Sequence, residues 1–348
     1  MDPIIYILFS YVCLAGLIVF LSIKLSDYID LLDKKTNLSG AFLGAVLLAI
    51  ITSLPELFTS LSSVIFLEES GMVIGNILGS NSFDILILGV CILLFYKKYG
   101  ADKLDFKSHL VVCIGLVCMY ISLIVPLLLG EHQLVVGNIN ICFVVVAIIY
   151  GIALWRMPKK DSDVEVKSIE VSQIETKKAE TIESPVKELS VKQIVFRFIV
   201  CSVLLVAVSI FITYATNDIA SYFNLETSTA GVLFLAIATS LPEVVSTLAL
   251  CYKGNFDASF GNILGSCLFN TLVLTITEII YFKGSILVPS DFASIKLVIL
   301  NFVSVITTIA ILVIKKPNKQ FKGERVVNYL LSIILILAYF VYYIIWFD

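Results

Sequence analysis

Ten apolar runs, separated by short polar segments, make up most of this chain of 348 residues. A membrane-spanning helix needs roughly 20 predominantly apolar residues, and each run reaches that length. We place the runs at about 3–23, 38–66, 72–95, 108–129, 134–156, 193–214, 228–251, 257–282, 292–314 and 326–346. The pattern predicts an all-α integral membrane protein with ten transmembrane helices.

One long polar segment, residues 157–192, divides the chain into two halves of five runs each. This segment is rich in Lys, Glu and Ser and contains no aromatic residue, which is typical of a flexible, solvated connection. We therefore expect a first five-helix repeat over 1–156, a linker over 157–192 and a second five-helix repeat over 193–348.

The composition excludes several classes of protein. The chain is 59% hydrophobic and 15% charged, whereas soluble domains are about half apolar and a quarter charged. The net charge of −3 gives no indication of nucleic-acid binding. The eight cysteines stand singly, without a CxxC pair, so we interpret them as small apolar side chains. The sequence predicts no cofactor and no obligate protein partner, only the lipid bilayer as its surroundings.

Lysine and arginine are unevenly distributed among the short segments between the runs. Thirteen fall on one side of the expected membrane, and two, Lys283 and Lys296, fall on the other. Short cytoplasmic loops carry the excess of positive charge in membrane proteins. We therefore expect a multi-pass protein of the cell (plasma) membrane with both termini outside and the 157–192 linker in the cytoplasm.

Two short motifs occur once in each half. TSLPE stands at 52–56 and 239–243, and GNILGS stands at 75–80 and 261–266. Because each half has an odd number of helices, the second half must be inserted upside down relative to the first. Inverted repeats of this kind are typical of secondary transporters, whose substrate sites lie near the midplane where the repeats meet.

The TSLPE motif brings several oxygen atoms together. In a helix, Glu56 shares a face with the hydroxyls three and four residues before it, and Glu243 does the same in the second copy. The proline in each motif has no N–H, so the carbonyls of Ile51 and Ala238 lose their helical partners. Hard oxygen donors suit Ca²⁺, and Na⁺ by the same logic.

The helices that carry GNILGS add further oxygens, because Ser80 and Asp84 are four residues apart, as are Ser266 and Asn270. A carboxylate at the centre of a membrane helix costs about 2.5–3.5 kcal/mol, and a bound cation or a proton would offset the repulsion among three of them. The candidate cage therefore consists of Thr52, Ser53, Glu56, Ser80 and Asp84 facing Thr239, Ser240, Glu243, Ser266 and Asn270.

A single such motif is also compatible with a proline kink whose polar groups satisfy one another, but two inverted copies favour an ion site. The paired TSLPE and GNILGS motifs resemble the two alpha-repeats of the calcium/cation antiporter superfamily, and among its branches the prokaryotic sodium/calcium exchangers. The resemblance places the alpha-1 motif at 44–89 and the alpha-2 motif at 231–275. It implies alternating access with central sites for one Ca²⁺ and several Na⁺.

The resemblance also implies roles for individual residues. Glu56 and Glu243 would bind Ca²⁺, while the motif threonines and serines, with the carbonyls of Ala49 and Ala236, would bind Na⁺. This chain departs from some prokaryotic relatives, which carry Asn in the first repeat and Asp in the second, because here the two are exchanged as Asp84 and Asn270. The carboxylate count is kept by this exchange.

The predicted function is therefore Na⁺/Ca²⁺ antiport, with H⁺/Ca²⁺ or K⁺-dependent Na⁺/Ca²⁺ antiport on the same fold as alternatives. An intramembrane aspartyl protease would need two facing aspartates, whereas the deep set holds one Asp and two Glu, so no enzyme activity is predicted. A passive cation channel is disfavoured by the inverted repeats. Glu278, near the end of the eighth run, is expected at the membrane interface, with a place along the ion path as the alternative.

Overall fold

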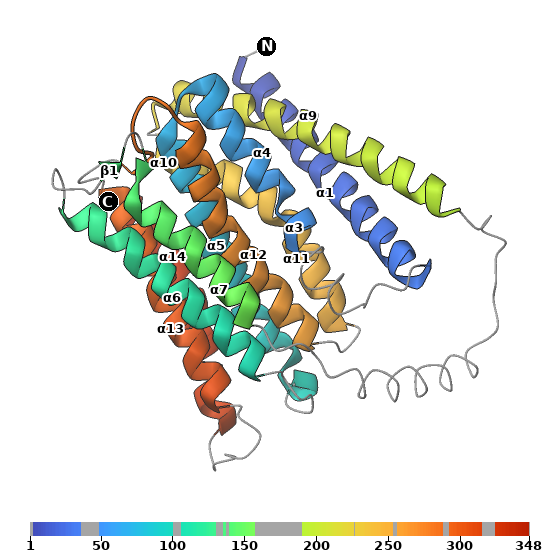
Figure 1. Cartoon of the computed structure of the whole chain (residues 1–348), viewed down its shortest axis with the longest axis vertical. Helices are drawn as coiled ribbons and strands as arrows, with labels where there is room; N and C mark the ends of the chain where they lie inside the picture. The colour runs from blue at the N-terminus through green and yellow to red at the C-terminus, as the bar shows by residue number, and fades with distance from the viewer. Residues whose placement is uncertain are drawn as a thin grey trace.

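A computed structural model describes residues 3–35, 49–99, 106–129, 135–136, 139–156, 190–225, 227–252, 256–287, 292–314 and 324–347. These residues form a bundle of long helices, with two-residue strands as the only extended elements in the described ranges (Figure 1). The beginning of the second predicted run and the 157–192 linker lie largely outside the described residues.

The first half begins with the long helix α1 and contains the first TSLPE motif in a broken helix. Its elements are α1 Pro3–Lys35, α3 Ala49–Thr52, α4 Leu54–Ser62, the π-helical turn η2 Ser63–Leu67, α5 Ser70–Tyr99, α6 Phe106–Leu129, β1 Val135–Val136, β2 Ile139–Asn140 and α7 Ile141–Arg156. The strands form a short antiparallel hairpin in which Val135 pairs with Asn140.

The second half repeats this order. Its elements are α9 Val191–Phe223, α10 Thr227–Ala230, the π-helical turn η4 Gly231–Leu235, α11 Ala236–Tyr252, α12 Phe256–Ile280, α13 Phe292–Ile314 and α14 Glu324–Phe347. Eight helices of the described ranges are long and apolar enough to cross a membrane. Two of the ten predicted spans, Ile141–Arg156 and Val326–Val341, form shorter apolar helices.

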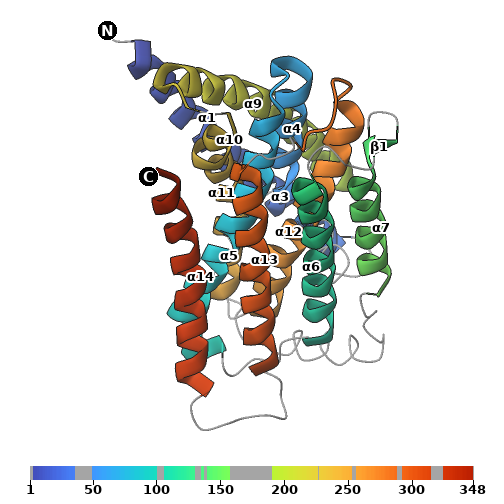
Figure 2. The same ribbon diagram turned by 90° about the vertical axis from the view of Figure 1, so that its left-hand side faces the viewer.

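The contacts between the halves follow the inverted repeat. Helix α1 packs against α9 and α11, and its counterpart α9 packs against α1 and α4. Helix α12 packs against α6 and α7, and its counterpart α5 packs against α13 and α14. Helices α5 and α12, which carry the two GNILGS motifs, also pack against each other. Figure 2 shows both chain ends and β1 toward the same end of the bundle.

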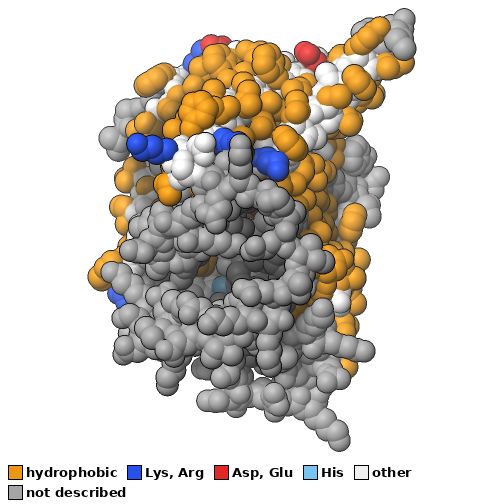
Figure 3. All heavy atoms as spheres, turned by 90° about the vertical axis from the view of Figure 1, so that its right-hand side faces the viewer, with side chains coloured by type: hydrophobic (Ala, Val, Ile, Leu, Met, Phe, Trp, Pro, Cys, Tyr) orange, Lys and Arg blue, Asp and Glu red, His pale blue; other side chains and the backbone are white. Residues whose placement is uncertain are grey.

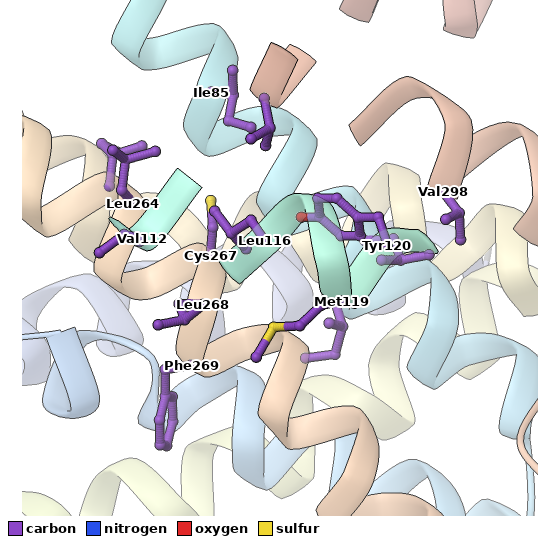
Figure 4. Packing of buried hydrophobic residues seen from close by; sticks show 14 of the residues in the cluster. Ile85, Val112, Leu116, Met119, Tyr120, Leu264, Cys267, Leu268, Phe269 and Val298 are labelled. Atoms are coloured by element: carbon purple, nitrogen blue, oxygen red, sulfur yellow. The ribbon is translucent and has the colours of Figure 1, made fainter. Parts of the chain in front are cut away.

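Helices α5, α6, α12 and α13 enclose the main apolar core. Figure 4 shows this packing around Leu116 and Tyr120 of α6, with Leu264 and Cys267 of α12 and Val298 of α13 nearby. All five side chains are fully buried. The core thus supports the two helices that carry the GNILGS motifs.

Helices α1 and α9 lie at the edge of the bundle and present apolar side chains outward. Phe9, Phe196, Val203 and Phe211 are each more than 60% exposed. Hydrophobic side chains dominate the uncovered part of this face in Figure 3. Exposed apolar surface of this extent is what lipid-facing helices require.

Both edge helices continue well beyond the apolar runs that predicted them. The runs at 3–23 and 193–214 become helices that end at Lys35 and Phe223. Neither extension contains glycine or proline, so the backbone has no reason to stop where the side chains become polar. The apolar run therefore marks the membrane thickness, whereas Asn224 in a left-handed conformation marks the helix end.

The two TSLPE motifs differ in backbone. In the first, the helix is interrupted at Ser53, which precedes Pro55 and has φ −92° and ψ 8°. In the second, α11 continues through Pro242. The helix is therefore interrupted at the motif of the first half, whereas in the second half it continues through the motif with a proline inside it.

Candidate functional site

The structure brings the ten predicted side chains into the interior of the bundle. Helices α3, α4 and α5 contribute one set, and helices α11 and α12 contribute the inverted set. Every member has 0% relative exposure: Thr52, Ser53, Glu56, Ser80, Asp84, Thr239, Ser240, Glu243, Ser266 and Asn270. Ala49 and Ala236, whose carbonyls were assigned to Na⁺, are also buried.

Each motif glutamate is held by a hydroxyl group of the other half. Ser53 Oγ donates to Glu243 Oε1 at 3.2 Å, and Ser240 Oγ donates to Glu56 Oε1 at 3.5 Å. Ser80 Oγ also lies 3.5 Å from Glu56 Oε1 and 3.3 Å from the carbonyl oxygen of Ala236. Each motif therefore supplies a serine hydroxyl to the glutamate of the other motif.

Many of the oxygen atoms at this junction lack a hydrogen-bond partner among the described residues. Buried polar atoms are rarely left unpaired, and an unpaired buried charge is strongly unfavourable. The unpaired atoms are Glu56 Oε2, Glu243 Oε2, Asp84 Oδ1, Asp84 Oδ2, Asn270 Oδ1 and Ser266 Oγ. All of them can accept from a donor or coordinate a hard cation.

Acidic side chains alone do not make this a metal centre. In the described part of the chain, no three His, Cys, Asp or Glu side chains form a group that could hold a metal ion. A cation at the junction would therefore need hydroxyl and carbonyl oxygens beside the carboxylates. Such a mixed oxygen set suits Ca²⁺ or Na⁺ and gives no nitrogen or sulfur ligand for a transition metal.

The asparagine of each GNILGS motif ties its helix to the following turn of the TSLPE helix. Asn76 Nδ2 donates to Thr59 Oγ1 at 2.9 Å and Ser60 Oγ at 3.0 Å. The equivalent bonds in the second half run from Asn262 Nδ2 to Ser246 Oγ at 2.9 Å and to Thr247 Oγ1 at 3.1 Å. The inverted symmetry therefore extends to individual hydrogen bonds.

The two halves differ in the hydrogen bonding of the side-chain oxygen of these asparagines. Asn76 Oδ1 accepts from Thr239 Oγ1 at 3.3 Å, whereas Asn262 Oδ1 has no partner in the described ranges. Ser80 Oγ is bonded across the halves, but the equivalent Ser266 Oγ is another of the unpaired atoms. We call the hydrogen-bonded set of Asn76, Ser80 and Thr239 the assembled half-site. In its inverted copy, the side-chain oxygens of Asn262 and Ser266 have no partner among the described residues.

The assembled half-site coincides with a very close approach of two backbones. A Cβ added at Gly231 of η4 would lie 2.6 Å from the carbonyl oxygen of Met72 and 3.0 Å from the amide nitrogen of Asn76. A Cβ added at Gly79 of α5 would lie 2.9 Å from the Cβ of Ala236. Only glycine at these two positions lets η4 and α11 pack this closely on α5.

Glu278 is buried within the protein near the end of α12, and its position at the membrane interface stays a prediction. Its side chain has 0% relative exposure and accepts hydrogen bonds from the backbone N–H of Asn140 at 2.8 Å, the N–H of Ile286 at 2.7 Å and Ser285 Oγ at 3.2 Å. The segment after α12 folds back over its end and covers the carboxylate. Glu278 therefore binds β2 and the segment that follows α12 to the end of this helix, and it lies outside the oxygen cluster.

Sequence reasoning counted Asn81 among the oxygens that follow GNILGS but left it out of the candidate cage, and it assigned no role to Asn76 or Asn262. For Asn76 and Asn262, the available signal was that an asparagine follows the first glycine in both copies of the GNILGS motif. Asn81 gave no such signal, because its equivalent in the second half is Cys267.

Comparison with known protein families matches both halves of the chain. A family model described as sodium/calcium exchanger protein matches residues 6–159 and again residues 194–347. Inner membrane protein YrbG of Escherichia coli (strain K12) is 24% identical over 259 residues, which is 74% of each chain.

Two solved structures share the fold. The crystal structure of the H⁺/Ca²⁺ exchanger CAX has a TM-score of 0.64 at 15% identity, over 97% of this chain and 87% of that chain. The sodium-calcium exchanger NCX_Mj, soaked with Na⁺ and Sr²⁺, has a TM-score of 0.59 at 19% identity, over 97% of both chains.

Proposed function

Because this chain belongs to the sodium/calcium exchanger protein family of membrane cation antiporters, we propose that it exchanges Na⁺ for Ca²⁺ by alternating access at the buried oxygen cluster. The observation that carries this proposal is the set of unpaired oxygens contributed by both inverted halves. Most buried polar atoms in proteins are paired, so a cluster of six unpaired oxygens at the junction of the two halves favours a bound cation.

Ca²⁺ would bind between Glu56 and Glu243. Each glutamate has one oxygen fixed by a serine of the opposite half and one unpaired oxygen. Two carboxylates neutralise a divalent cation, and the neighbouring hydroxyls extend the coordination toward the six to eight oxygens that Ca²⁺ prefers.

Na⁺ would occupy the positions where a hydroxyl meets a backbone carbonyl. Ser80 Oγ lies 3.3 Å from the carbonyl oxygen of Ala236, and Thr239 Oγ1 lies 3.3 Å from the same oxygen. The inverted copy of this position consists of Ser266 with the carbonyl of Ala49, to which Thr52 Oγ1 donates at 3.3 Å. Asp84 and Asn270 complete the two sides.

Exchange requires two arrangements of the same residues. In this proposal, the half-site in which Thr239 is bonded to Asn76 would close one path in the present arrangement, and its inverted copy around Ser266 and Asn262 would close the opposite path in the other arrangement. If more than two Na⁺ move per Ca²⁺, each net charge contributes about 2.3 kcal/mol per 100 mV of membrane potential.

Proton coupling is the second candidate, and Asp84 is the observation that favours it. Both of its carboxylate oxygens are buried and unpaired among the described residues, so a proton is one way to satisfy them. The TSLPE motifs support Na⁺, because they surround the glutamates with hydroxyl oxygens. The fold itself favours neither ion, since it resembles both an H⁺/Ca²⁺ and a sodium-calcium exchanger.

We further propose that both termini lie outside the cell and that the 157–192 linker is cytoplasmic. The excess of lysine in the short inner segments supports this orientation. The position of both chain ends toward one end of the bundle fits an even number of crossings (Figure 2).

The test is uptake of radioactive calcium into proteoliposomes that contain the purified full chain. One set is preloaded with Na⁺ and diluted into Na⁺-free buffer, and a matched set receives only a pH gradient. Uptake that requires internal Na⁺ and ignores the pH gradient is the expected result. Uptake that follows the pH gradient would refute Na⁺ coupling and support the proton-coupled alternative.

A further inference from the structure

A fully buried asparagine beside the oxygen cluster has its amide orientation fixed by its surroundings. Asn81 Nδ2 of α5 lies 3.0 Å from Tyr120 Oη, 3.2 Å from the carbonyl oxygen of Cys267 and 3.2 Å from Thr271 Oγ1. A backbone carbonyl can only accept, so the end of the amide that faces Cys267 must be the NH₂ group. Tyr120 and Cys267 meet in the same packed core (Figure 4).

This orientation determines that of a second asparagine. With its NH₂ group directed at Cys267, Asn81 presents Oδ1 to Asn270, whose Nδ2 donates to it at 3.2 Å. The amide nitrogen of Asn270 is thereby occupied, and Asn270 Oδ1 remains as its unpaired, buried end. A reversed Asn270 amide would place two N–H groups where the oxygen is now, and these would repel a cation.

We propose that Asn81 is a positioning residue that holds the side-chain oxygen of Asn270, rather than its NH₂ group, toward the transported cation. This inference rests on the proposed function, because it takes Asn270 as part of the cation site. It assigns specificity for cations to a residue that contacts no ion itself.

The two halves of the protein differ in a way that fits this role. The residue equivalent to Asn81 in the second repeat is Cys267, and the residue equivalent to Asn270 in the first repeat is Asp84. A carboxylate presents an oxygen in either orientation and needs no orienting partner, whereas an amide does. Asn270, the amide of the second repeat, has Asn81 of the first repeat as its orienting partner. Asp84 of the first repeat is a carboxylate, and the position equivalent to Asn81 in the second repeat is a cysteine.

The alternative is that Asn81 only ties α5 to α12. A double-mutant cycle separates the two roles, since a purely structural loss is independent of the side chain at 270. Asn81→Ala is made in the natural chain and in a chain with Asn270→Asp. Apparent Km values for Na⁺ and Ca²⁺, maximal transport rate and the cation-induced rise in melting temperature are measured for each.

In the natural background, Asn81→Ala should raise the apparent Km for the cations roughly tenfold, because a buried amide loses its fixed direction. In the Asn270→Asp background, the same substitution should not raise the Km, since either carboxylate oxygen can face the ion and the removal of Asn81 Oδ1 only relieves its contact with a carboxylate that cannot donate to it. Asn81→Ser, which is too short to reach Asn270, repeats the comparison if Asn81→Ala does not fold.

Asn301→Ala is the matched control. Asn301 is also fully buried on a helix packed against α5, and its Nδ2 donates to the carbonyl of Leu78, to Ser82 Oγ and to the carbonyl of Leu297. It should lower the melting temperature without changing the cation Km, equally in both backgrounds.

Equal effects of Asn81→Ala on the Km in the two backgrounds, or no effect in either, would overturn the positioning role. A natural chain whose melting temperature responds to neither Na⁺ nor Ca²⁺, and which transports neither, would overturn the proposed function itself. The two failures are therefore distinguishable.

Discussion

The close approach of η4 to α5 gives a prediction whose size can be worked from the structure. Gly231→Ala adds a Cβ 2.6 Å from the carbonyl oxygen of Met72 and 3.0 Å from the amide nitrogen of Asn76, and Cβ contacts under 3.0 Å are essentially never observed. Both clashing atoms belong to the α5 backbone, which cannot rotate away. One of the helices must therefore move by several tenths of an ångström.

Overpacking of this kind costs about 1–3 kcal/mol. The loss falls on the assembled half-site, because the displaced segment includes Asn76, which accepts the hydrogen bond from Thr239. We therefore expect Gly231→Ala to lower the melting temperature of the purified protein and to reduce its maximal transport rate.

Gly151→Ala is the matched control, because a Cβ at Gly151 of α7 would meet nothing within 4 Å. It should leave stability unchanged or raise it by about 0.5–1 kcal/mol, since alanine favours a helix over glycine. Both variants are compared in the same detergent at the same heating rate. A Gly231→Ala protein that is as stable and as active as Gly151→Ala would refute the reasoning.

Three further predictions concern buried carboxylates. Glu56→Gln or Glu243→Gln should abolish Ca²⁺ transport in proteoliposomes while the protein still elutes as a folded species in size-exclusion chromatography; full transport by the double variant would contradict the site. Asp84→Asn should alter the apparent Na⁺ affinity but preserve Na⁺-driven exchange, whereas loss of uptake driven by a pH gradient would identify Asp84 as a proton carrier. Glu278→Ala should destabilise the protein by about 1–3 kcal/mol, because it leaves the N–H groups of two connections unpaired, and it should not change the Ca²⁺ Km; a large Km change would show that Glu278 contributes to transport.

The ten-helix plan and the location of the candidate site could be predicted because both halves of the sequence carry five apolar runs and the same two motifs. Apolar runs identify membrane spans by length alone, and Glu56 and Glu243 stand out because a carboxylate in such a run is costly. The repeated prolines indicated disturbed helices, although the structure interrupts the helix at Ser53 and not at the equivalent place in α11.

Other features could not be predicted, because they depend on contacts between residues far apart in the chain. Asn81 gains its direction from Cys267, 186 residues later, which no local pattern reveals. The burial of Glu278 was not predicted, since its position near a helix end did not indicate that the following segment folds back and covers it. The difference between Asn76 and Asn262 is a property of one conformation, and identical motifs cannot encode it.

The reciprocal pairing of glutamates and serines has a consequence for biosynthesis. Glu56 accepts hydrogen bonds from Ser80 and from Ser240, and the ribosome adds Ser240 184 residues after Glu56. At about 5–20 residues per second, the first half waits roughly 10–40 s in the membrane before that partner exists. Throughout this interval Glu56 and Asp84 lie in an apolar environment without the residues of the second half that later surround them. A nascent chain arrested in the 157–192 linker would therefore be a target for membrane quality control, although all five of its helices have been made.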